Sequence, residues 1–154
     1  MRLPLLITLA VLALSQHSQA SPRIAIIIDD LGYSYSRGKA ITDLPADVTC
    51  AVIPFSPHGS RLAERASLAG KEVIVHMPMA AQQQARLDRG GLTLGMQQTE
   101  ILQAVREALG QVPQARGLNN HMGSALTEQA EPMGWLMGEL KAHQLFFVDS
   151  RTSG

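Results

Sequence analysis

The sequence predicts an α/β protein built on a parallel sheet, and three observations support this fold class. Short apolar, β-branched runs alternate with longer amphipathic segments along the chain. The first run, residues 24–28, has no polar alternation, which is typical of a parallel strand covered by helices. No low-complexity tract or Ser/Gly linker divides the chain after residue 20. We therefore expect one α/β domain.

Residues 1–20 have the composition of a secretory signal peptide. Arg2 gives a positive start, residues 3–14 are apolar, and Ser18 and Ala20 supply small residues for cleavage. The apolar run is shorter than the roughly 20 residues needed to cross a bilayer. We expect cleavage after Ala20, no stable membrane span afterwards, and an exported protein in the periplasm or another extracytoplasmic compartment. The expected domain then covers residues 21–154.

Charge and cysteine usage restrict the partners and the redox chemistry. The chain has 13 basic and 13 acidic residues, interspersed and without a polybasic run, so nucleic acid is excluded as a partner. The single Cys50 cannot form an internal disulfide. Its apolar neighbours predict a buried, unreactive thiol in a core strand.

Five strands and four helices are expected in alternation. The strand candidates are residues 24–28, 48–53, 72–75, 115–118 and 145–148. The helix candidates are residues 36–44, 58–69, 98–109 and 128–143. In the third helix, Ile101, Leu102, Val105 and Leu109 form one apolar stripe at helical spacing. Residues 79–97, rich in Gln, Arg and Gly, are expected to be a long loop on the functional side of the sheet.

Polar side chains follow four of the five strand candidates. In parallel α/β proteins, functional groups gather just beyond the C-terminal ends of the strands, where the connecting loops converge. The residues that the sequence places at this rim are Asp29, Asp30, His76, Asn119, Asn120, His121 and Asp149. We therefore treat them as one candidate site.

Each of these residues also has a purely structural interpretation. The two aspartates after the first strand could cap a turn, and the two asparagines could form a turn followed by an incidental surface histidine. His76 could be a core histidine bonded to a backbone carbonyl. Asp149 could form an ion pair with Arg151.

The combination of residue types nevertheless indicates a particular chemistry. Two imidazoles and one carboxylate are a common ligand set for a divalent metal, with positions left for water and substrate. A second, adjacent carboxylate can act as a general base. This arrangement suits hydrolysis of an amide or an ester.

Four strings in the sequence resemble a known family. IAIIIDDLGY, VIVHMPM, GLNNHMGSALT and FFVDSRTS occur in an order and spacing similar to those of the divergent polysaccharide deacetylases, which are exported bacterial proteins. The resemblance covers residues 24–154. It implies an incomplete, irregular (β/α) barrel of the polysaccharide deacetylase type, with about five β/α units present in this chain.

The resemblance also implies roles for the candidate residues. In the wider superfamily the first of two consecutive aspartates is the base and the second is a metal ligand, which implies base for Asp29 and ligand for Asp30. Two histidines complete that metal site, and here the candidates are His76 and His121. In the superfamily those histidines lie one helical turn apart, whereas here they follow two different strands. The implied cofactor is zinc or another divalent metal.

Further expectations follow for catalysis and substrate. Asn119 or Asn120 would orient the acyl group, and Asp149 is counted with them among the catalytic candidates. The expected activity is metal-dependent deacetylation of an envelope polysaccharide or a peptidoglycan-related glycan. Family members usually continue well past the DSRTS string, whereas this chain stops at Gly154. We therefore expect the C-terminal part of the domain to be missing.

Two other function classes are considered. The main alternative is a non-catalytic periplasmic protein that binds glycan or peptide and maintains the envelope on the same fold. A phosphoryl-transfer domain of receiver or haloacid type is excluded. A receiver would need an acidic phosphoacceptor where this chain has His76 and Met77. The haloacid pattern needs a residue between its two aspartates, and Asp29 and Asp30 are adjacent.

Overall fold

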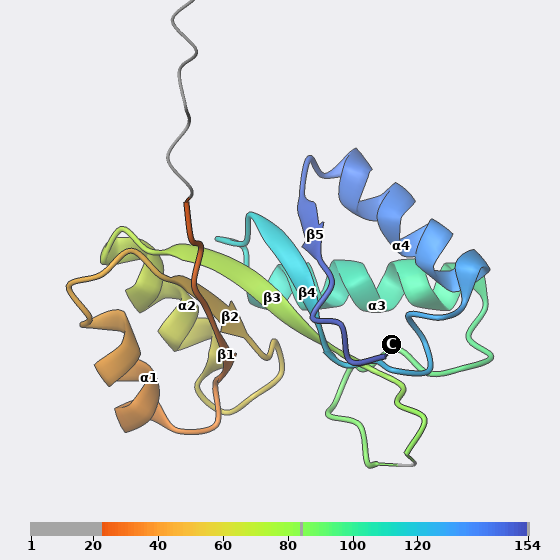
Figure 1. The fold of residues 1–154 in the computed structure, drawn as a ribbon, viewed down its shortest axis with the longest axis horizontal. Coiled ribbons are helices and arrows are strands. Elements are labelled where there is room, and N and C mark those ends of the chain that lie inside the picture. Colours follow the sequence, from red (N-terminus) through yellow and green to blue (C-terminus); the bar gives the residue numbers. More distant parts are fainter. Residues whose placement is uncertain (1–22, 84, 154) are drawn as a thin grey trace, which may run out of the picture.

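The computed structural model describes residues 23–83 and 85–153, which form strands and helices in alternation (Figure 1). The strands are β1 (Ile27–Leu31), β2 (Thr49–Val52), β3 (Glu72–Met79), β4 (Gly117–Met122) and β5 (Phe146–Val148). The helices are α1 (Tyr35–Thr42), α2 (Gly59–Leu68), α3 (Gln98–Gln111) and α4 (Ala130–Ala142). The predicted α/β class is confirmed. The predicted signal peptide, residues 1–20, lies outside the described residues.

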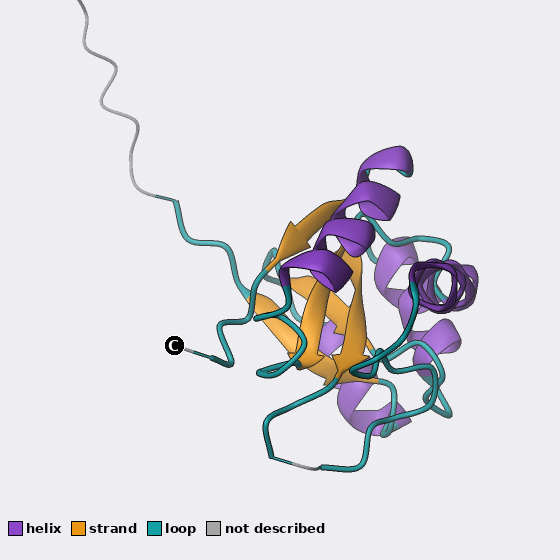
Figure 2. Cartoon of the chain, turned by 90° about the vertical axis from the view of Figure 1, so that its right-hand side faces the viewer, coloured by secondary structure: helices purple, strands orange, loops and turns teal. Residues whose placement is uncertain are grey.

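The strands form one parallel sheet in the order β1-β2-β3-β4-β5. Because β/α crossovers are right-handed, a sequential order that never reverses places the helices on the same face. Figure 2 shows the helices on one side of the strands and the C-terminal residues on the other. This is the arrangement of an incomplete (β/α) barrel, and the face opposite the helices is its inner face.

The hydrophobic core lies between the sheet and the helices. On β3 the odd-numbered residues from Val73 to Met79 belong to it, and α3 adds Ile101 and Val105 from its apolar stripe. Cys50 on β2 is fully buried in the same cluster, as the sequence predicted, and burial raises the pKa of its thiol. Successive strand residues point to opposite faces, so the even-numbered β3 residues point to the inner face.

The predicted bounds of the first strand were wrong. Ile24 and Ile26 are 89% and 51% exposed, and pairing with β2 starts only at Ile27. The apolar run therefore overlaps β1 but begins before it. Asp29 and Asp30, expected beyond the strand, lie inside β1.

The third and fourth strands also extend further than predicted. β3 continues past residue 75 to Met79, and β4 runs to Met122 rather than ending at residue 118. The reason is that backbone pairing between parallel strands does not depend on side-chain polarity. The ladder therefore continues through His76 and Asn119.

The loop after β3 lies at the functional end of the sheet, as predicted. In Figure 1 it is the green segment at the same end as the C-terminal residues. Leu92 anchors it, because its backbone N–H donates to Pro78 O at 2.8 Å and its carbonyl accepts from Ala80 N at 2.9 Å. The loop therefore folds back at Leu92 to contact the C-terminal end of β3.

No helix in the described part of the chain has the length and apolar character needed to cross a bilayer.

Candidate metal centre

Strand register brings two histidines and one asparagine to the inner face of the sheet. β3 and β4 pair His76 with Asn119 and Pro78 with His121. Since side chains two residues apart share a face, His76, Asn119 and His121 all project to the inner face. His76 lies 43 residues before Asn119 and 45 before His121 in the sequence. The parallel pairing alone therefore assembles this part of the site.

Asp29 and Asp30 join the site through an irregularity in β1. Between Ile28 and Leu31 the pairing advances three residues along β1 but only two along β2, which describes a β-bulge. Asp30 has a φ of 62°, in the left-handed region that disfavours most side chains by about 1–2 kcal/mol and that Asp tolerates better than most. Bulges redirect side chains, and this one places both carboxylates beside the histidines.

Three side-chain atoms form a compact triangle. Oδ1 of Asp30 lies 3.3 Å from Nε2 of His76 and 3.1 Å from Nδ1 of His121. The two histidine nitrogens are 3.1 Å apart. Each of the three atoms can donate an electron pair to a cation, so Asp30, His76 and His121 together could hold a metal ion.

Asn119 links this triangle to Asp29. Its Nδ2 donates a hydrogen bond to Oδ1 of Asp29 at 2.9 Å, and its Oδ1 lies 2.8 Å from Nδ1 of His76. Because an ionised carboxylate only accepts hydrogen bonds, the amide NH2 must face Asp29 and the amide oxygen must face His76. Nδ1 of His76 then carries the proton, and Nε2 turns an electron pair toward Asp30 and His121.

The ligand atoms lie at the border between core and solvent. The side chain of His76 is 4% exposed, that of His121 is 23% exposed and that of Asp30 is 65% exposed. Burial lowers the pKa of His76, against the opposing effect of its hydrogen bond with Asn119. The imidazole therefore stays neutral, the form that binds metal, at lower pH than an ordinary histidine. The cluster is closed on the His76 side and open on the Asp30 side.

One residue of the site was missed in the sequence. Asp88, in the loop after β3, places Oδ2 3.6 Å from Nε2 of His121, and its other oxygen accepts a hydrogen bond from the hydroxyl of Tyr33. That bond is the main cause that raises the pKa of Tyr33 to about 12. The sequence contains no periodic pattern across this loop, so the approach of Asp88 could not be predicted.

Two predicted residues are not brought to the cluster. The amide of Asn120 donates to Met122 O at 2.7 Å and accepts from Ser150 N at 2.8 Å. It lies on the opposite face from Asn119 because adjacent strand residues alternate. Asp149 accepts from the backbone N–H of Arg151 at 2.8 Å, a local turn contact. Among the described residues the structure contains no ion pair between these two side chains.

The open side of the cluster borders a cavity of about 480 Å³. Asp29, Asp30, His121 and Asp88 line one part of it, and apolar side chains such as Ile53 line another. This volume falls in the range of small-molecule sites. Three carboxylates and an imidazole therefore face a space that a substrate could enter.

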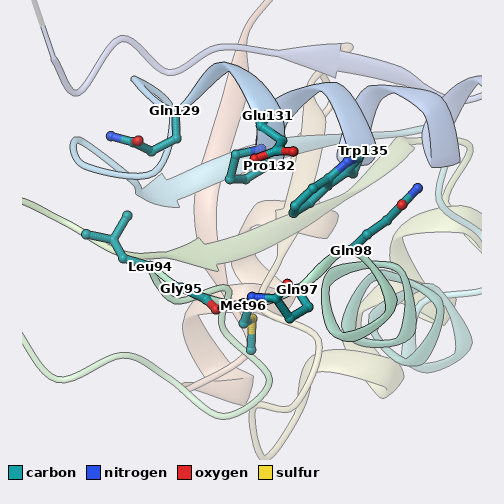
Figure 3. A pocket seen from close by; sticks show the side chains of 9 residues that line it. All are labelled: Leu94, Gly95, Met96, Gln97, Gln98, Gln129, Glu131, Pro132 and Trp135. Atoms are coloured by element: carbon teal, nitrogen blue, oxygen red, sulfur yellow. Dashed lines mark hydrogen bonds between the residues drawn. The ribbon is translucent and has the colours of Figure 1, made fainter.

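A second hollow of about 560 Å³ lies between the N-terminal ends of α3 and α4 (Figure 3). Its lining includes Trp135 and the side-chain amides of Gln98 and Gln129, and Glu131 is the ionisable residue there. It holds none of the triangle's atoms. The chemistry is therefore assigned to the inner face of the sheet.

The sequence matches the profile of the family described as divergent polysaccharide deacetylase over residues 26–154. The chain belongs to the divergent polysaccharide deacetylase family. The resemblance predicted from the four sequence strings is thereby confirmed.

Two curated relatives resemble this family member closely. An uncharacterized protein of Haemophilus influenzae is 39% identical over 137 residues, which are 89% of this chain and 49% of the relative. The uncharacterized protein YibQ of Escherichia coli is 39% identical over 145 residues, which are 94% of this chain and 45% of the relative. The chain thus spans about half the length of these relatives.

A solved structure supports the fold. The crystal structure of an uncharacterized protein from Agrobacterium tumefaciens superimposes with a TM-score of 0.78 at 20% sequence identity, covering 84% of this chain and 54% of that one. At this level of identity the likeness concerns the fold alone. It agrees with the α/β architecture described above.

Proposed function

We propose that this protein is a metal-dependent deacetylase that removes N- or O-acetyl groups from an envelope carbohydrate. Asp30, His76 and His121 would hold a divalent cation, with zinc the first candidate, and Asp29 would act as general base. The observation that carries the proposal is the triangle of ligand atoms, with sides of 3.1, 3.1 and 3.3 Å.

The triangle fits a metal in size and in chemistry. Zinc binds nitrogen and oxygen at about 2.0–2.1 Å, which spaces neighbouring ligand atoms at about 2.9 Å in an octahedron and about 3.4 Å in a tetrahedron. The three measured sides fall between these limits. The bond between Asn119 and Nδ1 of His76 leaves Nε2 as an electron-pair donor, within 3.3 Å of the other two ligand atoms. When bound, a divalent cation would polarise an acyl oxygen and make water more acidic.

Asp29 is suited to take up a proton. Its side chain is 41% exposed, it borders the cavity, and the hydrogen bond from Asn119 fixes one of its oxygens. A carboxylate held this way retains acceptor capacity for a proton leaving water. Asn119 is occupied by Asp29 and His76, so it acts here by orienting those two groups. This differs from the expected contact between Asn119 and the acyl group.

An exported location is part of the proposal. The composition of residues 1–20 supports secretion, which would bring the site to envelope polysaccharide or peptidoglycan-related glycan. Family membership supports a carbohydrate substrate. The exposed Asp30 and the adjoining cavity leave the cluster accessible to a polymer from outside.

The proposal is tested by the metal content of the purified protein. Wild type is compared with His76→Ala and His121→Ala after dialysis against zinc, by elemental analysis of protein whose folding is verified by circular dichroism. We expect about one zinc ion per chain in wild type and loss of zinc in both variants. His143→Ala is the matched control, because His143 caps α4 and contacts Glu139 rather than the cluster.

Acetate release from acetylated envelope glycans follows as the second measurement. Release by zinc-loaded wild type, and none by His121→Ala, is the expected result. Folded wild type without zinc would refute the metal site. Stoichiometric zinc without hydrolysis of any acetylated glycan would favour a glycan-binding role for the same inner face.

A further inference from the structure

The two histidines of the cluster have matching surroundings. In each ring, one nitrogen faces Asp30 and the other has an oxygen nearby. For His76 that oxygen belongs to Asn119, at 2.8 Å and within the sheet. For His121 it belongs to Asp88, at 3.6 Å and in the loop after β3.

Asp88 is held in place from two directions. Tyr33, which follows β1, donates its hydroxyl proton to Oδ1 of Asp88. The next residues pack on Phe55: the guanidinium of Arg89 lies 5.3 Å from the centre of that ring, and a side chain at Gly90 would collide with it. The Asp88 side chain is 27% exposed, so its charge is partly shielded from water. The loop thus presents a fixed negative charge to His121.

We propose that Asp88 is a positioning residue for the metal ligand His121, and that Tyr33 orients Asp88 for this role. At 3.6 Å the carboxylate is beyond direct hydrogen-bond length, so it acts on the imidazole as a nearby charge or through one bridging water. In either case it favours the proton on Nε2 and leaves Nδ1 free to bind metal. Such carboxylate partners of metal-binding histidines orient the ring and raise its basicity.

The inference rests on the proposed metal site and extends it to a segment outside the sheet. The ligand atoms come from β1, β3 and β4, which are fixed by backbone pairing. Asp88 comes from a loop anchored at Leu92 and by Tyr33. Metal affinity therefore depends on the position of this loop relative to His121.

The test measures the zinc dissociation constant of the intact protein by competition with a chromophoric chelator. Asp88→Asn removes the charge but keeps an oxygen that can accept from Tyr33. Tyr33→Phe keeps the charge but removes that donor. We expect Asp88→Asn to weaken zinc binding about 10- to 100-fold, as loss of an outer partner usually does, and Tyr33→Phe to weaken it less.

Two further variants separate positioning from other effects. Asp47→Asn removes one exposed carboxylate at the opposite end of the sheet, before β2, and should leave zinc affinity unchanged. Asp88→Glu restores the charge and should recover most of the lost affinity. A merely structural role would instead lower the unfolding temperature of Asp88→Asn without this recovery.

The outcomes distinguish this inference from the proposed function. Zinc binding by wild type with unchanged affinity in Asp88→Asn would overturn the role of Asp88 alone. Equal weakening in Asp47→Asn would also overturn it, because the effect would then be one of overall charge. Wild type that binds no zinc would overturn the metal site itself.

Discussion

Asn119 lies with its amide oxygen 2.8 Å from Nδ1 of His76, and this contact decides which nitrogen of the ring is available to a cation. The amide can serve His76 in this way because its NH2 group is taken by Asp29 at 2.9 Å. Asn119 is 1% exposed, and its bond with His76 is buried, whereas its bond with Asp29 lies at the border of the cavity. The proposed base and the proposed ligand are therefore coupled through one buried side chain.

Replacing Asn119 with leucine tests this coupling. Asn119→Leu keeps the approximate volume but leaves the buried Nδ1–H of His76 without an acceptor, which should lower the free energy of unfolding by about 1–3 kcal/mol. Zinc affinity should also fall about 10- to 100-fold, because the ring is free to adopt the other tautomer. Urea denaturation and chelator competition measure the two effects. Unchanged zinc affinity in a folded variant would contradict the tautomer argument.

A substitution at Asp29 should lower catalysis and leave metal binding unchanged. Asp29→Asn keeps an oxygen that can accept from Asn119 but cannot take a proton, so zinc content should stay at the wild-type value. Acetate release should fall about 10²- to 10⁴-fold in kcat, the usual contribution of a general base. Steady-state kinetics on an acetylated glycan provide the measurement. Retained kcat would assign the base to another group.

Much of this arrangement could be predicted from the sequence, because apolar runs and polar interruptions recur with β/α spacing. The order of the elements and the gathering of His76 and His121 at one end of the sheet both followed from that pattern. The pattern did not predict that Asn119 and Asn120 point to opposite faces of β4, because both residues were expected to lie beyond the end of the strand. Only the register shows that one faces the cluster and the other faces away.

Two further features could not be predicted, for physical reasons. The bulge at Asp30 depends on how β1 pairs with β2, and pairing is a non-local property. The approach of Asp88 depends on a loop whose position is set by contacts with Tyr33 and Phe55 from other segments. Hydrophobic periodicity carries no information about either.

Asn120 should affect stability and leave the metal unaffected. Its amide ties β4 to residues 150–152, accepting from Ser150 N at 2.8 Å and donating to Oγ1 of Thr152 at 3.3 Å. Asn120 is 1% exposed, so Asn120→Ala should cost about 1–3 kcal/mol of unfolding free energy through unsatisfied groups. Zinc content should equal that of wild type. Loss of zinc at full stability would place Asn120 in the site after all.

The buried His76 should make stability depend on pH. Burial lowers the pKa of folded His76 below the ordinary 6.5 that it has in the unfolded chain. At a pH between the folded and the unfolded pKa, the unfolded chain therefore binds a proton that the folded protein does not. Neutral His76 therefore contributes fully to the free energy of unfolding above about pH 6.5. This contribution is lost as the pH falls from 6.5 through the lowered pKa of the folded protein. Urea denaturation of metal-free protein from neutral to acidic pH measures it. His76→Gln should show a shallower decline, and an identical decline would refute the assignment.

Two substitutions at Asp30, whose backbone is left-handed, should have the same effect on zinc binding but different effects on stability. Asp30→Gly and Asp30→Ala both remove the carboxylate, and both should lose zinc. Glycine adopts a φ of 62° without steric cost, whereas the Cβ of alanine is disfavoured there by about 1–2 kcal/mol. The greater freedom of glycine in the unfolded chain offsets about 0.4–1 kcal/mol of that difference. Asp30→Gly should therefore be the more stable variant by up to about 1.6 kcal/mol in urea denaturation. Greater stability of Asp30→Ala would mean that the bulge relaxes once the carboxylate is gone, and that its conformation is imposed by the cluster rather than by the pairing of β1 with β2.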